Sequence, residues 1–346
     1  MRRGAWIGIG LVAVMLLVLP PLTGFHPYYL YLVSTALLFG TVATSWNLLA
    51  YAGQISFGHA AFFGLGGYGA ALASLAGSSP WLAILLGGAV GAVGAAGIGL
   101  ASARLRGAYL ALATLAYAEI WRGVAHNWTA VSGGGAGLIG IPPLPTLAWL
   151  PLDFTRGRAG GYYLSLAFLL LVIAVFWGIL RSRLGLAFAA VREEEERAGL
   201  LGVHPLPWKI LAFALSGFFS ALAGGLYVHM VRVVEPDLIF SRYFSILPLV
   251  MATFGGLHTL LGPAAAALGL YLVSELLLHP YVPAFHQLPY ALALIVVVLY
   301  LPGGLAGLFP SPRPSPPSPL SSPPRGGEGR VRGERGRGKR RQHGAA

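Results

Sequence analysis

Apolar residues occur along this chain in long runs that short polar stretches separate. A helix that crosses the hydrocarbon core of a bilayer needs about 20 predominantly apolar residues. The pattern therefore predicts an all-α polytopic integral membrane protein with about ten transmembrane helices, at approximately residues 6–22, 28–50, 58–75, 80–100, 107–125, 161–180, 209–231, 242–257, 263–279 and 288–304. The first run follows Arg2 and Arg3, as in a signal peptide, but no small-x-small cleavage site follows it, so we expect a retained helix.

The stretch 181–208 breaks this pattern because it is rich in charge. Arg192 and Glu196, like Glu193 and Arg197, are four residues apart, so each pair would share one face of a helix. We expect Pro205 and Pro207 to end that helix. The stretch predicts a short helix outside the membrane that docks into another protein, and a solvated connector is the alternative.

Two polar breaks interrupt the apolar pattern, and each lies between two predicted helices. Non-helical backbone at membrane depth must line a cavity or be covered by protein. We therefore predict that these breaks line a translocation path, formed at the first break by Gly53, Gln54, Ser56, Gly58 and His59 and at the second by Pro236 and Ser241. The breaks align at a constant offset along the chain, which suggests two five-helix halves related as an inverted repeat.

Small residues recur at every fourth position in two of the apolar segments. Gly87 is followed by Gly91, and Gly217 by Ala221 and Gly225. Such spacing lets the backbones of membrane helices approach closely. We expect these segments to pack tightly against partner helices.

Ionisable residues within apolar segments are costly and often functional. Glu119 lies three residues before Arg122, which predicts a local ion pair. Glu275 would either extend to the outer interface with His279 or face a cavity. His59 is equally compatible with a buried structural histidine.

Composition supports a membrane protein, because 56% of the 346 residues are hydrophobic and only 10% are charged. A soluble domain has roughly 25% charged residues. The net charge of +12 comes mostly from residues 311–346, which hold nine of the 23 basic residues and two of the 11 acidic ones. We expect residues 310–346 to form a disordered Pro/Ser then Arg/Gly-rich tail, and residues 1–309 to form the membrane domain. Without interleaved aromatic residues, the tail does not predict nucleic-acid binding.

Basic residues are distributed unevenly between the two predicted faces. With a cytoplasmic N-terminus, ten crossings place nine Lys and Arg residues inside even without the tail, against five outside. Positive charge favours the cytoplasmic side. We therefore expect both termini and the loop 181–208 to be cytoplasmic, in a multi-pass protein of the cytoplasmic (inner) membrane that contacts lipid.

Motifs of catalysis and nucleotide binding are missing from the sequence. It has no cysteine, no metal-binding His-Glu-x-x-His spacing and no glycine loop followed by Lys and Ser or Thr. The chain is therefore not expected to be an enzyme or to bind a cofactor itself. If transport is driven by ATP, ATP and Mg must bind to separate ATPase subunits.

Residues 47–68, NLLAYAGQISFGHAAFFGLGGY, resemble the opening motif of the branched-chain amino acid permease family of the LivM type. Further matches extend in the family's order and spacing over residues 40–305. The loop from Arg192 to Val203 resembles the family's cytoplasmic coupling loop and departs from it at Glu196 and Arg197. The resemblance implies that the loop seats on an ATPase subunit, with a docking segment that includes Arg192, Glu193, Glu196, Ala198 and Gly202.

The resemblance also implies the other subunits of a transport complex: a sister permease of the LivH type, two ATPase subunits and an extracytoplasmic substrate-binding protein. The expected function is import of branched-chain amino acids. In one alternative, the same transport complex imports urea, short amides or another small polar solute. An ion-coupled secondary carrier is a second alternative, and a membrane scaffold would not explain the broken helices.

Overall fold

A computed structural model of the chain describes residues 20, 24, 26–146, 159–278, 288–300 and 303–308. These residues all belong to the first of two units into which the chain divides, Met1–Phe309. Most of the predicted segment 6–22 and the whole tail 310–346 lie outside the described residues.

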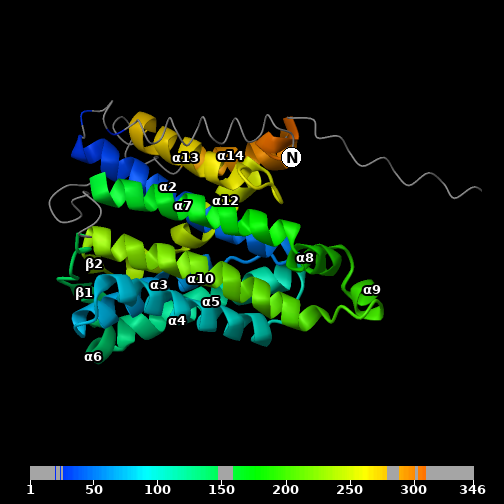
Figure 1. Cartoon of the computed structure of the whole chain (residues 1–346), viewed down its shortest axis with the longest axis horizontal. Coiled ribbons are helices and arrows are strands. Elements are labelled where there is room, and N and C mark those ends of the chain that lie inside the picture. The colour runs from blue at the N-terminus through cyan, green and yellow to red at the C-terminus, as the bar shows by residue number, and fades with distance from the viewer. Residues whose placement is uncertain are drawn as a thin grey trace, which may run out of the picture. The chain divides into compact units, whose positions relative to one another are not determined.

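Helices make up most of the described chain (Figure 1). Each predicted apolar segment from 28–50 to 288–304 coincides with one longer helix or, for 263–279, with a helix that continues into a π-helical turn, Ser274–Leu278. The helices are α2 Pro27–Tyr51, α3 His59–Leu75, α4 Pro80–Ala101, α5 Gly107–Asn127, α6 Thr129–Ser132, α7 Ala159–Arg181, α8 Arg183–Glu193, α9 Glu195–Leu200, α10 Pro205–Val231, α11 Pro236–Ile239, α12 Arg242–Gly255, α13 Gly262–Val273 and α14 Leu288–Tyr300.

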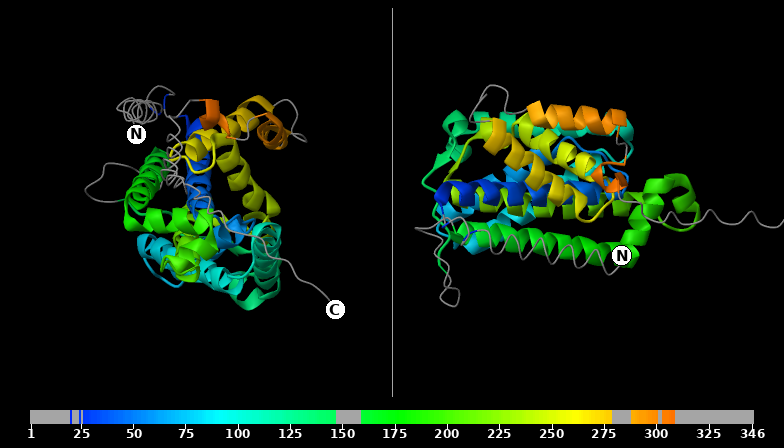
Figure 2. Two further views of the ribbon diagram at one scale, coloured as in Figure 1. Left: turned by 90° about the vertical axis from the view of Figure 1, so that its right-hand side faces the viewer. Right: turned by 90° about the horizontal axis from the view of Figure 1, so that it is seen from above.

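Two short strands and two 3-10 turns complete the described elements. Strands β1 Leu138–Ile139 and β2 Val233–Val234 pair antiparallel, with Leu138 opposite Val234. The 3-10 turns are Gly134–Ala136 and Leu305–Leu308. Strands β1 and β2 lie at one end of the helices, called here the β end, and α9 lies at the other, called the α9 end (Figures 1 and 2).

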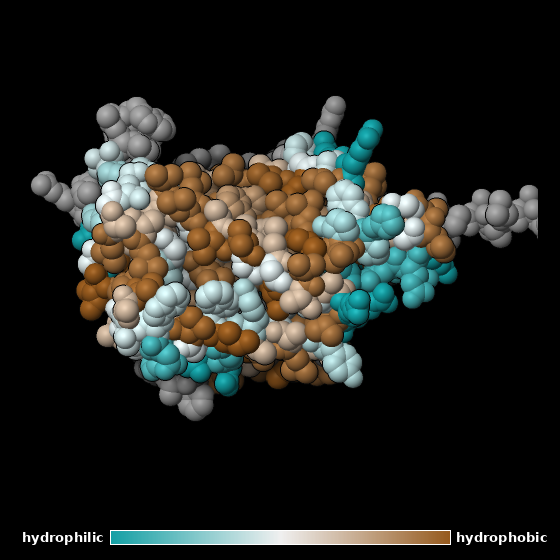
Figure 3. All heavy atoms as spheres, turned by 90° about the horizontal axis from the view of Figure 1, so that it is seen from below, coloured by the Kyte–Doolittle hydropathy of each residue, from teal (hydrophilic) through white to brown (hydrophobic). Residues whose placement is uncertain are grey.

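Five helical stretches in the described residues are long and apolar enough to cross a membrane. They are α2, α4, α7, α10 and the stretch Pro236–Gly255, which joins α11 and α12. Apolar side chains cover the middle of the face shown in Figure 3, and polar side chains gather toward the α9 end. This distribution is typical of a protein that presents an apolar belt to lipid.

Proline begins several of these helices. Pro27, Pro80 and Pro205 occupy the first turns of α2, α4 and α10. Proline suits this position because the first N–H groups of a helix have no intrahelical partner. The prediction that Pro205 and Pro207 end the helix before them is therefore wrong: α9 ends at Leu200, and Pro205 starts α10.

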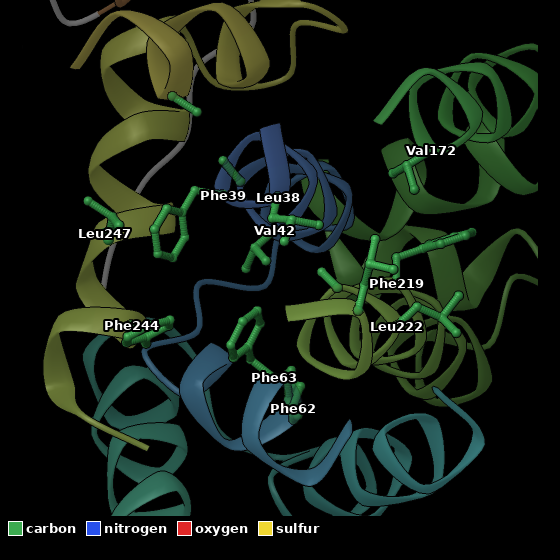
Figure 4. Close-up of a cluster of buried hydrophobic side chains, with 14 of the residues drawn as sticks. Leu38, Phe39, Val42, Phe62, Phe63, Val172, Phe219, Leu222, Phe244 and Leu247 are labelled. Carbon is green, nitrogen blue, oxygen red and sulfur yellow. The ribbon is translucent and has the colours of Figure 1, made fainter. Parts of the chain in front are cut away.

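Helix α2 is enclosed by other helices over most of its length, from Leu32 to Ala50, whereas Tyr28 and Tyr29 at its start are exposed. It packs against α7, α10, α12 and α13, and the close-up in Figure 4 shows it at the centre of the buried apolar cluster. The buried side chain of Asn47 in α2 donates to the carbonyl oxygen of Thr259 at 2.7 Å and accepts from the backbone N–H of His258 at 2.9 Å. These bonds fix the loop between α12 and α13 to the central helix.

Helices α3 to α5 and helices α12 to α14 form two groups with matching contacts. In the first group, α4 packs against α3 and α10, and α5 packs against α3. In the second group, α13 packs against α12 and α2, and α14 packs against α12. The second group thus repeats the first, with α2 in the place of α10.

Glycines allow α3, α4 and α10 to meet at backbone distance. A Cβ atom on Gly91 would overlap the Cβ of Ala221, and one on Gly217 would overlap the Cβ of Ala95. A Cβ on Gly66 of α3 would overlap the backbone of Ala221. The predicted close packing is confirmed at these positions, because no side chain larger than hydrogen fits there.

Gly91→Ala is expected to lower the thermal unfolding midpoint of the purified protein, because overpacking of a tight contact costs about 1–3 kcal/mol. Gly97→Ala is the matched control on the same helix, since nothing lies within 4 Å of a Cβ at Gly97. Alanine favours helix over glycine by up to about 1 kcal/mol, so this control should unfold at an unchanged or higher temperature. Equal midpoints for the two variants would refute the close contact.

Candidate functional site

The first predicted break separates α2 from α3. Helix α2 is about 37 Å long and α3 only about 25 Å, at a rise of 1.5 Å per residue. The short helix begins inside the bundle, where a Cβ on Gly58 would lie 2.6 Å from the carbonyl oxygen of Thr114. The chain therefore leaves α2 at its end and returns into the protein before it becomes helical again.

Backbone groups in this break find their partners within the protein. The indole Nε1 of Trp46 donates to the carbonyl oxygen of Ser56 at 2.7 Å. The N–H of Phe57 donates to Oγ1 of Thr114 at 2.9 Å, and the N–H of Gly58 donates to Oγ of Ser56 at 3.0 Å. Side chains from α2 and α5 thus replace the missing helical hydrogen bonds.

His59 is the first residue of α3 and directly follows this break. The hydroxyl of Ser216 donates its proton to the carbonyl oxygen of Ser45 at 2.7 Å, so it must accept from Nε2–H of His59 at 2.9 Å. Nδ1 of His59 then carries the lone pair, and it has no hydrogen-bond partner among the described residues. This arrangement fits a neutral, buried histidine that joins α3 to α10.

A cavity of about 420 Å³ lies where the first break meets the predicted coupling segment. Gly53 and Gln54 line it together with the run from Val191 to Glu196. The contact is direct, because Gly53 has a φ of +78° and a Cβ there would lie 2.9 Å from Cα of Arg192. Two regions that the sequence singled out separately are therefore neighbours.

The other first-break residues predicted to line the path lie in packed protein. Ser56 and His59 have no exposed surface, and Gly58 is buried. In the structure these residues make hydrogen bonds within the protein and cover the break, whereas Gly53 and Gln54 border the cavity.

The predicted coupling helix is two helices. Glu194 is extended, with φ −160° and ψ 108°, and separates α8 from α9. The expected pairing of Arg192 with Glu196 and of Glu193 with Arg197 is therefore wrong, because the interruption destroys the four-residue register. Arg197 instead pairs with Glu194 at 2.8 Å, and Arg192 lies 3.9 Å from Glu193.

Glu195 makes the firmest charge contacts of the coupling segment, and the sequence analysis missed it. Its carboxylate lies 2.6 Å from Nζ of Lys209 and 2.9 Å from a guanidinium nitrogen of Arg106. The Lys209 side chain is only 3% exposed and also donates to the carbonyl oxygen of Ala103. These bonds join the start of α9 to α10 and to the α4–α5 connection. The signal in the sequence for this ion pair was Lys209, a lysine at the beginning of an apolar segment.

Arg192 also contacts residues of the central helix. Its guanidinium lies 5.0 Å from the ring centre of Tyr51, and the Tyr51 ring packs edge-on against His258. Burial and the charge of Arg192 lower the pKa of the His258 side chain, which favours its neutral form. The end of α8 is thus in contact with α2, and Tyr51 of α2 in turn contacts the α12–α13 loop.

The tip of α9 exposes apolar side chains, of which Leu200 was not among the residues that the sequence pattern selected as contact surface. Leu200 and Leu201 are 88% and 83% exposed, and they lie next to Gly202, which has a φ of +83°. Ala198 is 3% exposed and packs inward. Two leucines in succession within a charged loop were the available signal, because solvated turns seldom retain them.

The second predicted break runs from β2 through α11 to the start of α12. Pro236 is buried at the beginning of α11. Phe240 stacks on Tyr68 with ring centres 5.8 Å apart, and its ring fills the space that a Cβ on Gly64 would need. The break therefore inserts an aromatic side chain against the glycine face of α3.

Four charged residues fasten this break at the β end. Arg122 lies 2.8 Å from Glu119, which confirms the predicted local pair, and 2.9 Å from Asp237. Arg242 lies 2.9 Å from the other oxygen of Glu119. The network connects α5 to both α11 and α12, although each exposed pair in it contributes only about 0.2–1 kcal/mol.

Ser241 of the second break lines another cavity, of about 400 Å³. Glu275 lines the same cavity, whereas His279, its other expected neighbour, lies outside the described residues. In the described ranges, no group of three or more His, Asp or Glu side chains is placed to hold a metal ion.

Comparison with known proteins places these features in a family. Residues 28–301 match the family described as branched-chain amino acid transport system / permease component. The chain is 31% identical over 290 residues to the LivM high-affinity branched-chain amino acid transport permease of Salmonella typhimurium, and 30% identical to that of Escherichia coli. Each match covers 77% of this chain and 66% of the relative, just under two thirds of its length.

No solved structure matches the chain significantly. The family match extends from α2 to the end of α14 and so includes both breaks and the α8–α9 segment. The chain is thus a multi-pass membrane protein that belongs to the family of permease components of branched-chain amino acid transport systems.

Proposed function

We propose that the chain is the permease subunit of an ATP-driven importer of branched-chain amino acids. It would form the translocation path with a second permease of the LivH type and be driven by two ATPase subunits that bind ATP and Mg. A soluble binding protein would deliver the amino acid at the outer face. Both relatives named above are described as permeases for branched-chain amino acids, which supports this cargo.

The observation that carries the proposal is the contact between Gly53 and Arg192. It joins the first break to the α8–α9 segment across one cavity. Force applied to α9 would reach the break through α8, because the close approach at Gly53 leaves no space between them. A separate motor that moves α9 could therefore change access to the cavity.

The α9 end would be cytoplasmic, and the β end would face the outside. The apolar segments would give ten crossings of the inner membrane, and the distribution of Lys and Arg would then favour a cytoplasmic position for both termini. The matching contacts of the two helix groups support an inverted repeat in which α2 corresponds to α10 and α3 to α12. The two breaks would then serve opposite faces of the membrane, as in transporters built on such repeats.

Leu201→Glu should lower ATP-dependent leucine uptake at least tenfold, because a carboxylate replaces an apolar contact with the ATPase. The measurement is uptake of labelled leucine by proteoliposomes that contain both permeases, the ATPases and the binding protein. Ile139→Glu is the control, since Ile139 is 74% exposed at the opposite end. Uptake that is driven by an ion gradient without ATPases would instead establish a secondary carrier.

Single cysteines should report the orientation, because the chain contains none of its own. We expect a membrane-impermeant maleimide to label Leu201→Cys only in inside-out vesicles and Ile139→Cys only in right-side-out vesicles. Both side chains are largely exposed, so accessibility within the protein does not limit the reaction. The reverse labelling pattern would overturn the proposed topology.

Glu195→Gln should reduce leucine uptake at least fivefold while ATP hydrolysis continues. The substitution leaves Lys209 buried without its counter-ion, and removal of one partner of a buried pair costs about 3–5 kcal/mol. α9 would then lose its attachment to α10, and motor movement would no longer reach the breaks. Glu195→Asp, which keeps the carboxylate and should retain most of the uptake, is the control, and wild-type uptake by Glu195→Gln would contradict the coupling role.

A further inference from the structure

The cavity beside the second break has the chemistry of an ammonium-binding site. Its volume is about 400 Å³, within the range of about 300–1,000 Å³ that is usual for small-ligand pockets. Residues of α2, α10, α11, α12 and α13 contribute to it, together with the π-helical turn that continues α13. The polar and aromatic members that matter here are Tyr31, Tyr227, Tyr243, Tyr271, Ser241 and Glu275.

Charge in this lining is one-sided. Glu275 supplies a carboxylate, and no Lys or Arg belongs to the lining that the structure describes. The faces of tyrosine rings are electron-rich and attract cations, most strongly where water is excluded. A carboxylate among aromatic rings therefore favours a cationic group over an anion or a neutral amide.

The aromatic wall is rigid enough to hold a ligand in one place. Phe244 packs against Phe39 at 5.3 Å, Tyr243 at 5.9 Å and Tyr227 at 6.1 Å between ring centres. Phe39 in turn contacts Tyr271 at 5.4 Å. Figure 4 shows Phe39 on α2 beside Phe244 on α12. Such mutual packing fixes side-chain rotamers before a ligand arrives, which reduces the entropy lost on binding.

The backbone around Glu275 is also specialised. Glu275 lies in the π-helical turn Ser274–Leu278, which continues α13. Short π-helical turns are rare and occur frequently at functional sites, where they change the direction of side chains. An ionisable residue within a membrane helix is likewise a common mark of a substrate path. The turn and the carboxylate thus point independently to a ligand.

We propose that this cavity binds a zwitterionic amino acid, with Glu275 as the counter-ion of its ammonium group. The aromatic rings surround the ammonium and the aliphatic side chain, and the hydroxyls of Ser241 and of the tyrosines are donors for the carboxylate. Because Ser241 belongs to the second break, movement of that break opens or closes the cavity. The assignment rests on the proposed import function and adds to it a substrate-binding site within this chain.

Glu275→Gln tests the assignment in the complete transporter, reconstituted with its binding protein and supplied with labelled L-leucine. Uptake should fall at least tenfold, while ATP hydrolysis stimulated by the loaded binding protein stays within twofold of wild type. Glu275→Asp, which keeps the charge, should recover a large part of the uptake. Wild-type uptake by Glu275→Gln would overturn the site, whereas absence of leucine uptake by the wild type would overturn the import function itself.

Ligand preference supplies a second measurement that a purely structural glutamate would not change. The purified permease–ATPase complex should bind L-leucine at least tenfold more tightly than 4-methylpentanoate, which has the same carbon skeleton without the amino group. Glu275→Gln should remove this preference, and its persistence would refute the counter-ion role.

A pair of tyrosine variants keeps the test decisive if Glu275→Gln does not assemble. Tyr271→Phe retains the ring and should keep most of the preference for L-leucine over 4-methylpentanoate. Tyr271→Leu removes the ring and should reduce the preference several-fold. Equal behaviour of these two variants would show that the aromatic wall does not contact the ammonium group.

Discussion

A peptide group that leaves helical geometry inside a membrane protein must find another hydrogen-bond partner, since lipid provides none. The break between α2 and α3 obeys this constraint through three neighbours. The side chains of Trp46 and Thr114 form hydrogen bonds with its backbone, and the hydroxyl oxygen of Ser56 accepts from the N–H of Gly58. Because these partners come from α2 and α5 as well as from the break itself, the break is part of the packed core and cannot move independently of it.

The same constraint explains the density of glycine around α3. A helix that starts inside the bundle has few turns with which to bury surface, so it must approach its neighbours closely. Gly66 against α10 and Gly64 against Phe240 provide that approach. Close contact without a driving hydrophobic effect is how membrane helices associate. The short helix is therefore held by backbone proximity rather than by large interdigitating side chains.

The attachment of α9 to the rest of the protein depends on a buried charge. Lys209 has almost no exposed surface, and its partner Glu195 stands at the start of α9. Burial of this pair fixes α9 to α10, while the exposed ion network around Arg122 fixes the opposite end less firmly. The molecule thus has a firm attachment beside the α8–α9 segment and a weaker one beside the second break.

The sequence by itself determined the elements of this protein. Long apolar runs and small residues at every fourth position are local patterns, and they predicted the longer helices, both breaks and the tight contacts of Gly91 and Gly217. Helix boundaries near Pro205 were wrong because proline is compatible with either end of a connection. The tertiary structure alone decided that Gly53 meets Arg192, that Glu195 rather than Glu196 is paired, and that Glu275 shares a cavity with Ser241. Each of these contacts joins residues that are distant in the chain or depends on a local break at Glu194, and such relations follow from the packing of whole helices rather than from residue spacing.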